Sequence, residues 1–135
     1  MTETHFDRLR REHRELDELF GNFLAALERQ DPEAAARAAA AFDATLRRHT
    51  AEEDERLYPP PESGTLAALP GEDEAARRAR ELRLEHVQIR EVSGMIVRLV
   101  AEDRDLVGAR RLAPNLARRW DAHTTREERE VFRAD

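Results

Sequence analysis

The chain contains no cysteine, which excludes disulfide bonds, thiolate catalysis, zinc fingers and iron–sulfur clusters. It contains no lysine either, so its 23 basic residues are all arginines, against 29 acidic residues and a formal net charge of -6. An acidic chain without a basic tract is not typical of proteins that bind nucleic acid or an anionic membrane surface. No apolar run approaches the ~20 residues that a transmembrane helix needs, and the N-terminus lacks an apolar signal segment. We therefore expect a cytoplasmic protein with no nucleic-acid or membrane partner.

Glycine, proline and aromatic residues are also scarce, with 5 glycines, 6 prolines and 5% aromatic residues. Alanine, leucine, arginine and glutamate dominate the composition, and all four favour helices. A length of 135 residues suits one domain with one buried core. We expect a single all-α domain that spans residues 1–135.

Apolar residues recur in steps of three and four along four segments, which is typical of helices that bury one face. The only long connection, residues 58–72, contains four of the six prolines and separates two helical hairpins. This pattern predicts an up-down-up-down four-helix bundle. Its helices are expected over residues 5–29, 32–57, 73–102 and 105–132.

Several residues mark the helix boundaries. Asp31 and Pro32 have the preferences of an N-cap and a first helical position, and Asp103 or Asp105 is expected to cap the fourth helix. Pro114 lies inside the fourth segment and should kink the helix or break it locally, since proline lacks the N–H of a helical hydrogen bond.

The chain repeats itself. Residues 12–19 align with 85–92 at an offset of 73, and residues 49–58 align with 123–132 at an offset of 74. The domain is therefore predicted to consist of two copies of one helical hairpin. Each copy carries one histidine on its first helix, and a histidine followed four residues later by a glutamate on its second helix.

These repeated polar residues fall on the apolar stripes. Each histidine lies about 18 residues from its hairpin turn, so all four share one layer if both turns lie at the same end of the bundle. A four-residue step turns about 40° past a full circle, so each glutamate faces the same interior as its histidine. The candidate metal ligands are His13, His49, Glu53, His86, His123 and Glu127.

Two interpretations of this layer remain open. Buried imidazoles and carboxylates need partners, which are either metal ions or one another in a metal-free polar core. Imidazole with carboxylate, and without thiolate, suits iron, manganese or zinc. Two glutamates could bridge two ions and leave two histidines for each, as carboxylate-bridged iron pairs do in other helix bundles.

The combination of motifs resembles the hemerythrin-like HHE cation-binding domains over essentially the whole chain. The motifs are EH-x2-L at His13, HTAEEDERLYP at His49, EHVQI at His86 and HTTREEREVF at His123. The resemblance implies a four-helix bundle with a non-haem di-iron centre that binds dioxygen. It implies that His13 and His49 bind one iron, that His86 and His123 bind the other, and that Glu53 bridges them.

The sequence departs from the oxygen-carrying hemerythrins at two positions. Their third helix supplies a second histidine four residues after the first, where this chain has Arg90. The site then has four histidines rather than five, and both irons keep open positions, which favours reactive chemistry over reversible oxygen carriage. Their last carboxylate corresponds to Glu128, whereas the internal repeat and the apolar stripe favour Glu127.

The leading hypothesis is a di-iron protein that binds dioxygen or a related small oxidant, with a diatomic molecule or peroxide as its partner. Alternatives are a di-iron enzyme that reduces peroxide, dioxygen or nitric oxide, an iron storage or sensing module, and a metal-free adaptor. In the enzyme, Arg90 could stabilise an anionic intermediate. Asp17 lies four residues after His13 and is expected to have an outer or surface role rather than to be an extra ligand, and an ion pair with Arg90 across the bundle would explain both residues.

The residues around the predicted ligands are given lesser roles. We expect Glu12 and Glu85 to be solvated, with the orientation of an imidazole as the alternative role. Bulky neighbours are expected to close the core and wall the site, namely Leu16, Tyr58, Ile89, Trp120 and Phe132.

Overall fold

The computed structural model describes residues 3–58 and 71–133, and over this range it contains four α-helices and no strand. They are α1 (His5–Glu28), α2 (Pro32–Arg56), α3 (Glu74–Ala101) and α4 (Leu106–Glu130). The predicted all-α class is confirmed, and each helix ends within two residues of its expected bounds. Most of the connection predicted at 58–72 lies outside the described residues.

Side chains cap every helix at its N-terminus. Thr4 and Asp7 form a capping box on α1, in which each side chain accepts a hydrogen bond from the other residue's backbone N–H. Asp31, Asp73 and Asp105 each accept from the N–H three residues further on. The two sequence alternatives for the fourth helix are thereby resolved in favour of Asp105.

Pro114 does not interrupt α4, so the expected local break is wrong. Proline removes one helical donor, which leaves the carbonyl of Arg110 without its usual partner. Pro114 and Arg110 are both exposed, so water can take the place of that donor and the helix continues.

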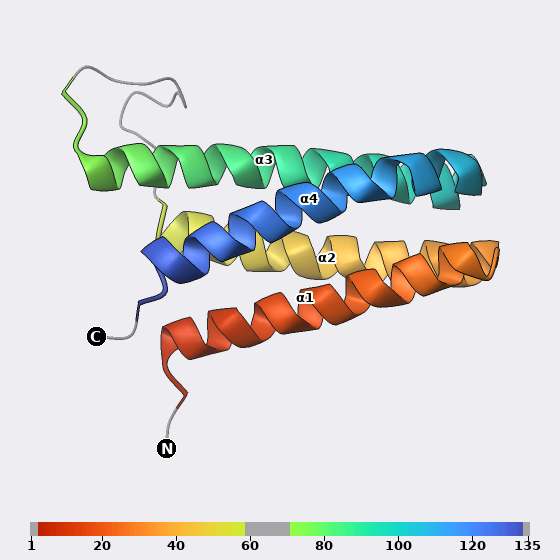
Figure 1. Ribbon diagram of the computed structural model, residues 1–135, viewed down its shortest axis with the longest axis horizontal. Helices are drawn as coiled ribbons and strands as arrows, with labels where there is room; N and C mark the ends of the chain where they lie inside the picture. Colours follow the sequence, from red (N-terminus) through yellow and green to blue (C-terminus); the bar gives the residue numbers. More distant parts are fainter. Residues whose placement is uncertain (1–2, 59–70, 134–135) are drawn as a thin grey trace.

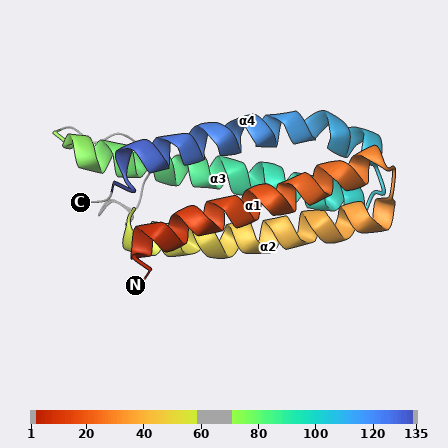
Figure 2. The same cartoon turned by 60° about the horizontal axis from the view of Figure 1, so that its bottom comes forward.

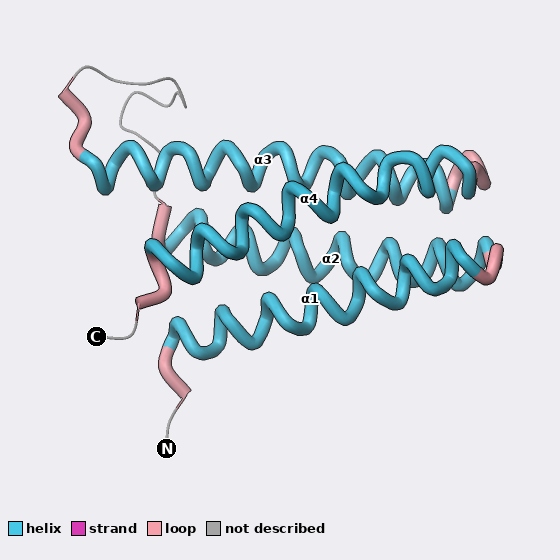
Figure 3. Tube along the Cα trace, viewed as in Figure 1, coloured by secondary structure: helices cyan, strands magenta, loops and turns pink. Residues whose placement is uncertain are grey.

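The four helices form a ring in which each contacts the next. α1 packs on α2, α2 on α3 and α3 on α4, and α4 closes the ring against α1. The two hairpin turns lie at one end of the bundle and both chain ends lie at the other (Figures 1 and 2). A tube view shows the same up-down-up-down path (Figure 3). The assumption that placed the four histidines in one layer therefore holds.

The two hairpin turns share an unusual backbone conformation. Gln30 and Arg104 have positive φ angles of 56° and 53°, directly before the N-caps of α2 and α4. Left-handed backbone costs a non-glycine residue free energy. That both hairpins reverse in the same way agrees with the internal repeat.

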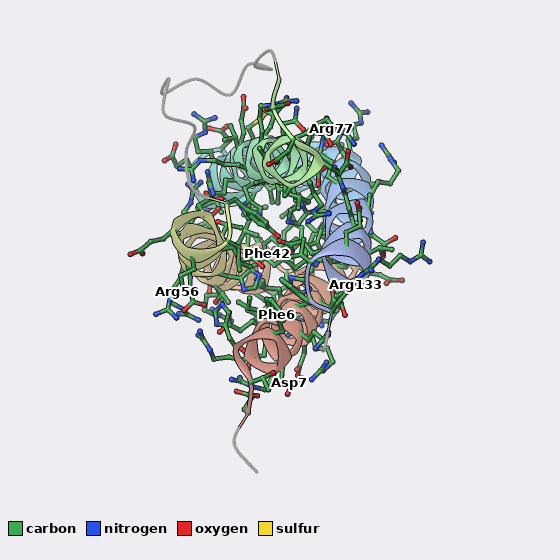
Figure 4. All side chains as sticks on the ribbon, turned by 90° about the vertical axis from the view of Figure 1, so that its left-hand side faces the viewer. Phe6, Asp7, Phe42, Arg56, Arg77 and Arg133 are labelled. Carbon is green, nitrogen blue, oxygen red and sulfur yellow. The ribbon has the colours of Figure 1, made fainter. Side chains whose placement is uncertain are left out.

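An apolar core fills the half of the bundle that is nearer the turns. It includes Phe20, Phe23, Phe42 and Val100, all at most 8% exposed. Viewed along the bundle, Phe42 lies between the helices while Arg56 points outward (Figure 4). Burial of each large apolar side chain contributes about 1.5–3 kcal/mol to stability. None of the described helices has a stretch that is both long and apolar enough to cross a membrane.

Candidate metal centre

The six predicted ligands meet in one buried layer in the other half of the bundle. Each is at most 2% exposed. They form two overlapping groups of four residues, and in each group the ligand atoms lie within 4.8 Å of one another. Both groups contain Glu53 and Glu127; the first adds His13 and His49, and the second adds His86 and His123.

The two glutamates each span both hairpins. The two carboxylate oxygens of Glu53 lie 3.2 Å from Nε2 of His49 and 3.0 Å from Nε2 of His86. Oε1 of Glu127 lies 3.1 Å from Nε2 of both His13 and His123. Each glutamate therefore contacts one histidine of each hairpin.

The inward-facing atoms of the layer have no hydrogen-bond partners. They are Nε2 of all four histidines, both carboxylate oxygens of Glu53 and Oε1 of Glu127. These atoms are close to one another, but their contacts do not have hydrogen-bond geometry. Each buried polar atom left unsatisfied costs about 1–3 kcal/mol. Nitrogen and oxygen donors turned toward a common centre fit a cation, and this set suits iron, manganese or zinc.

The outward-facing nitrogen of each imidazole contacts a carboxylate from an adjacent helix. Since a carboxylate can only accept, Nδ1–H donates, and in the neutral imidazole the lone pair of Nε2 then faces the centre. Such carboxylates orient ligand imidazoles and raise their basicity. The pairs are His13 with Glu128 at 3.2 Å, and His49 with Glu12, His86 with Asp54 and His123 with Glu85, each at 2.7 Å.

These contacts correct the expectation that Glu12 and Glu85 are solvated. Both glutamates immediately precede a first-helix histidine, and each reaches across its own hairpin to the histidine of the second helix. Glu128 also takes this outer role, with its side chain 42% exposed, while Glu127 lies in the centre.

The electrostatics of the layer fit a site for cations. Burial alone would lower the pKa of His49, but Glu53 and Glu12 outweigh it and raise the pKa to about 8. Burial opposes protonation of His86 and His123 in the same way, and neighbouring carboxylates again raise both pKa values. Burial would raise the pKa of Glu127, yet the surrounding histidines hold it well below its usual range. The carboxylates thus favour positive charge in the layer, as protons or as metal ions.

Tyr58 has a polar contact that the sequence interpretation missed. It is 2% exposed, and its hydroxyl donates to Oε2 of Glu127 at 2.9 Å. Burial, followed by the charges of Glu127 and Glu53, raises the pKa of the phenol, so it stays protonated as a donor. Its repeat partner Phe132 is fully buried beside His13, with ring centroids 5.3 Å apart. The sequence signal for this polar contact is the difference between the repeats, since one has Tyr58 where the other has Phe132.

The expected ion pair between Asp17 and Arg90 is wrong. Asp17 accepts a hydrogen bond from the indole N–H of Trp120 at 2.8 Å. Nη1 of Arg90 donates to Thr50 at 3.0 Å and to Asp54 at 3.3 Å. The physical reason is that α1 and α3 lie diagonally across the ring and do not share a packing face. Arg90 therefore acts on the layer through Asp54, the partner of His86, rather than facing the centre itself.

Bulky side chains surround the layer as expected. The Trp120 ring lies 5.4 Å from the His13 ring and 6.3 Å from the His123 ring. Leu16 and Ile89 are at most 1% exposed and follow their histidines by one turn. These contacts keep bulk water away from the polar atoms.

One comparison with known proteins agrees with this geometry. The model of the hemerythrin HHE cation binding domain family matches residues 4–134. The comparisons with curated proteins and with solved structures found no match.

Proposed function

The chain belongs to the hemerythrin HHE cation binding domain family, whose members bind metal cations, and from this we propose that its buried layer holds two iron ions and binds a small oxidant such as dioxygen. We also propose that residues 1–135 form one such domain. Manganese or zinc could use the same donors. The observation that carries the proposal is the set of buried donor atoms without hydrogen-bond partners, which face one centre.

The two groups of donors suggest how the ions would be held. His13 and His49 would bind one ion, His86 and His123 the other, and the two glutamates would bridge them. Each ion would then have two imidazoles and up to two carboxylates from the protein. Iron accepts more ligands than these, so both positions would keep room for an exogenous molecule.

A bound iron pair would supply the redox chemistry for binding or reducing the oxidant. The chain's own residues hold the imidazoles in orientation, exclude water and keep a proton close by. The hydroxyl of Tyr58 holds that proton at Oε2 of Glu127. The carboxylates on the outer nitrogens keep the four imidazoles turned inward.

A second candidate function is an enzyme that reduces peroxide, dioxygen or nitric oxide. The observation that favours it is Arg90, which stands where the oxygen-carrying hemerythrins have a fifth histidine and which binds Asp54 and Thr50. With four histidines, both ions would be open to exogenous molecules. A stable oxygenated form that reverses under vacuum would support the binding function, whereas rapid oxidation with turnover of peroxide would support the enzyme.

The metal proposal is tested by metal analysis of protein from iron-replete cells, with an optical spectrum recorded in air. We expect His49→Ala and Glu53→Ala each to lower the iron content sharply and to remove the ligand-to-metal absorption. His5→Ala is the matched control, because His5 lies outside the layer and should leave both readouts unchanged. Wild-type iron stoichiometry in both ligand variants would refute the assignment.

A further inference from the structure

Burial of the layer raises the question of how a molecule reaches it. All six proposed ligands are at most 2% exposed. Aromatic and aliphatic side chains cover the space between them and solvent, among them Trp120, Phe132 and Ile89. A small oxidant must therefore pass through a thin part of this wall.

A surface hollow between α3 and α4 marks such a place. It has a volume of about 280 Å³, and Ile89, Ala122 and His123 are among its lining residues. His123 belongs both to the hollow and to the buried layer. Ile89 follows His86 by one helical turn and is 1% exposed. One layer of side chains therefore separates the hollow from the proposed metal position on this side.

Polar contacts between the two helices frame the hollow. Arg126 on α4 donates to Glu81 at 2.6 Å and to Glu85 at 3.1 Å on α3. One turn before His123, Arg119 donates to Gln88 at 3.3 Å. Glu81 and Glu85 offset the charge of Arg126. Between the two contacts, the lining of the hollow includes aliphatic side chains. An ion would lose its hydration on passing Ile89, so the surroundings favour an uncharged molecule.

The internal repeat provides a matched surface between α1 and α2. There Leu16 takes the place of Ile89, and Arg48 takes the place of Ala122. Leu16 is 0% exposed, as well buried as Ile89. The exposed Arg48 is much larger than the methyl group of Ala122, so the two faces differ in how closely solvent approaches the layer.

We propose that the hollow between α3 and α4 is the access route by which a small uncharged molecule, of the size of dioxygen or nitric oxide, reaches the buried layer, and that Ile89 is its gate. The purpose of the route rests on the proposed function. The route itself is a property of the packing and can be measured without metal. Ile89 acts by position only and does not touch the reacting atoms.

Trp120 provides the measurement. It is the only tryptophan of the chain, it is 4% exposed, and its ring lies 6.3 Å from that of His123. In metal-free protein, dioxygen quenching of Trp120 phosphorescence reports how fast the gas reaches the layer. We expect Ile89→Ala to raise the quenching rate constant severalfold, Ile89→Val to raise it less, and Ala122→Phe to lower it.

Leu16→Ala is the matched control, since it removes the same number of atoms from the counterpart position. A rise as large as that of Ile89→Ala would overturn the proposal, because it would show that dioxygen penetrates wherever the wall is thinned. An unchanged constant in Ala122→Phe would also overturn it. If Ile89→Ala does not fold, Ile89→Val and Ala122→Phe decide between the outcomes.

A second experiment uses the iron-loaded protein. A gate changes the energy barrier to the passage of dioxygen between solvent and the layer, but not the free energy of the bound or the unbound state. Ile89→Val should therefore raise the association and dissociation rate constants of dioxygen by the same factor and leave the affinity and the iron content unchanged. A changed affinity with unchanged rates of access would contradict the gate. Protein that binds no metal would refute the proposed function instead, and the quenching constants would still decide the route.

Discussion

The carboxylates that hold the imidazoles from outside allow a quantitative comparison within the one molecule. Asp54 and Glu128 are repeat partners that each follow a proposed bridging glutamate by one residue. Asp54 accepts from Nδ1 of His86 at 2.7 Å with a side chain 11% exposed. Glu128 contacts Nδ1 of His13 at 3.2 Å with a side chain 42% exposed. We expect Asp54→Asn to weaken metal binding much more than Glu128→Gln.

The size of each effect follows from burial. Loss of a carboxylate that orients a ligand histidine costs about 10–100-fold in metal affinity, which corresponds to about 1.4–2.7 kcal/mol. Asp54 should fall in this range, because little water can replace it and Arg90 would lose its charged partner. The contact of Glu128 resembles a surface ion pair of about 0–1 kcal/mol, so its loss should be less than about fivefold.

The assay is a competition titration against a chelator of known affinity, performed on both variants at one pH and ionic strength. Both substitutions keep the shape of the side chain and leave a carbonyl oxygen that can still accept from Nδ1–H, so they test charge rather than packing. Far-ultraviolet circular dichroism of the metal-free variants serves as the folding control. Equal losses, or a larger loss in Glu128→Gln, would refute the argument that burial sets the strength of these contacts.

Three further outcomes are expected. Tyr58→Phe should lower the free energy of unfolding of the metal-free protein by about 1.5–3 kcal/mol in urea, since it leaves the buried charge of Glu127 without its donor; an unchanged midpoint would contradict the contact. Gln30→Gly and Arg104→Gly should each stabilise the protein by about 1 kcal/mol in the same assay, because both residues have positive φ, and a loss of stability in both would argue against these turn conformations. In a metal titration, the histidine pair on α3 and α4 should fill before the pair on α1 and α2, because carboxylates hold both of its imidazoles at 2.7 Å whereas the His13 contact is 3.2 Å. Removal of His123 from α4 should therefore abolish the tighter phase. Loss of the weaker phase instead would reverse the assignment.

Much of the fold could be predicted because the local signals agree with one another. The apolar periodicity, the capping aspartates and the near-equal spacing of the histidines from their turns all indicate the same bundle. At Pro114 the expected break did not occur, because the loss of one helical donor is tolerated where the affected carbonyl is exposed to water. The sequence could predict that Glu127 rather than Glu128 lies in the centre, because the apolar stripe marks the inward face of α4.

The contacts outside the ligand layer could not be predicted in the same way. The outer carboxylates reach histidines on neighbouring helices, as in the contact of Glu12 with His49, so their roles depend on which helices adjoin and at what height. The failed pairing of Asp17 with Arg90 has the same origin, because repeat alignment shows equivalence and not adjacency. The indole of Trp120 is the actual donor to Asp17.

The duplicated hairpin also explains why the site is symmetric in its ligands and asymmetric in its surroundings. In the proposed centre the ligands would serve two similar positions, and both copies carry the same histidines and glutamates. The surroundings face different neighbours: Tyr58 donates to Glu127, whereas its partner Phe132 has no hydroxyl to offer Glu53. Arg90 reinforces Asp54, whereas its repeat partner is the acidic Asp17 and cannot do the same for Glu128. Two ions in the proposed centre would therefore have ligands of different basicity and a different supply of protons, and this asymmetry would favour binding of an oxidant at one ion over the other.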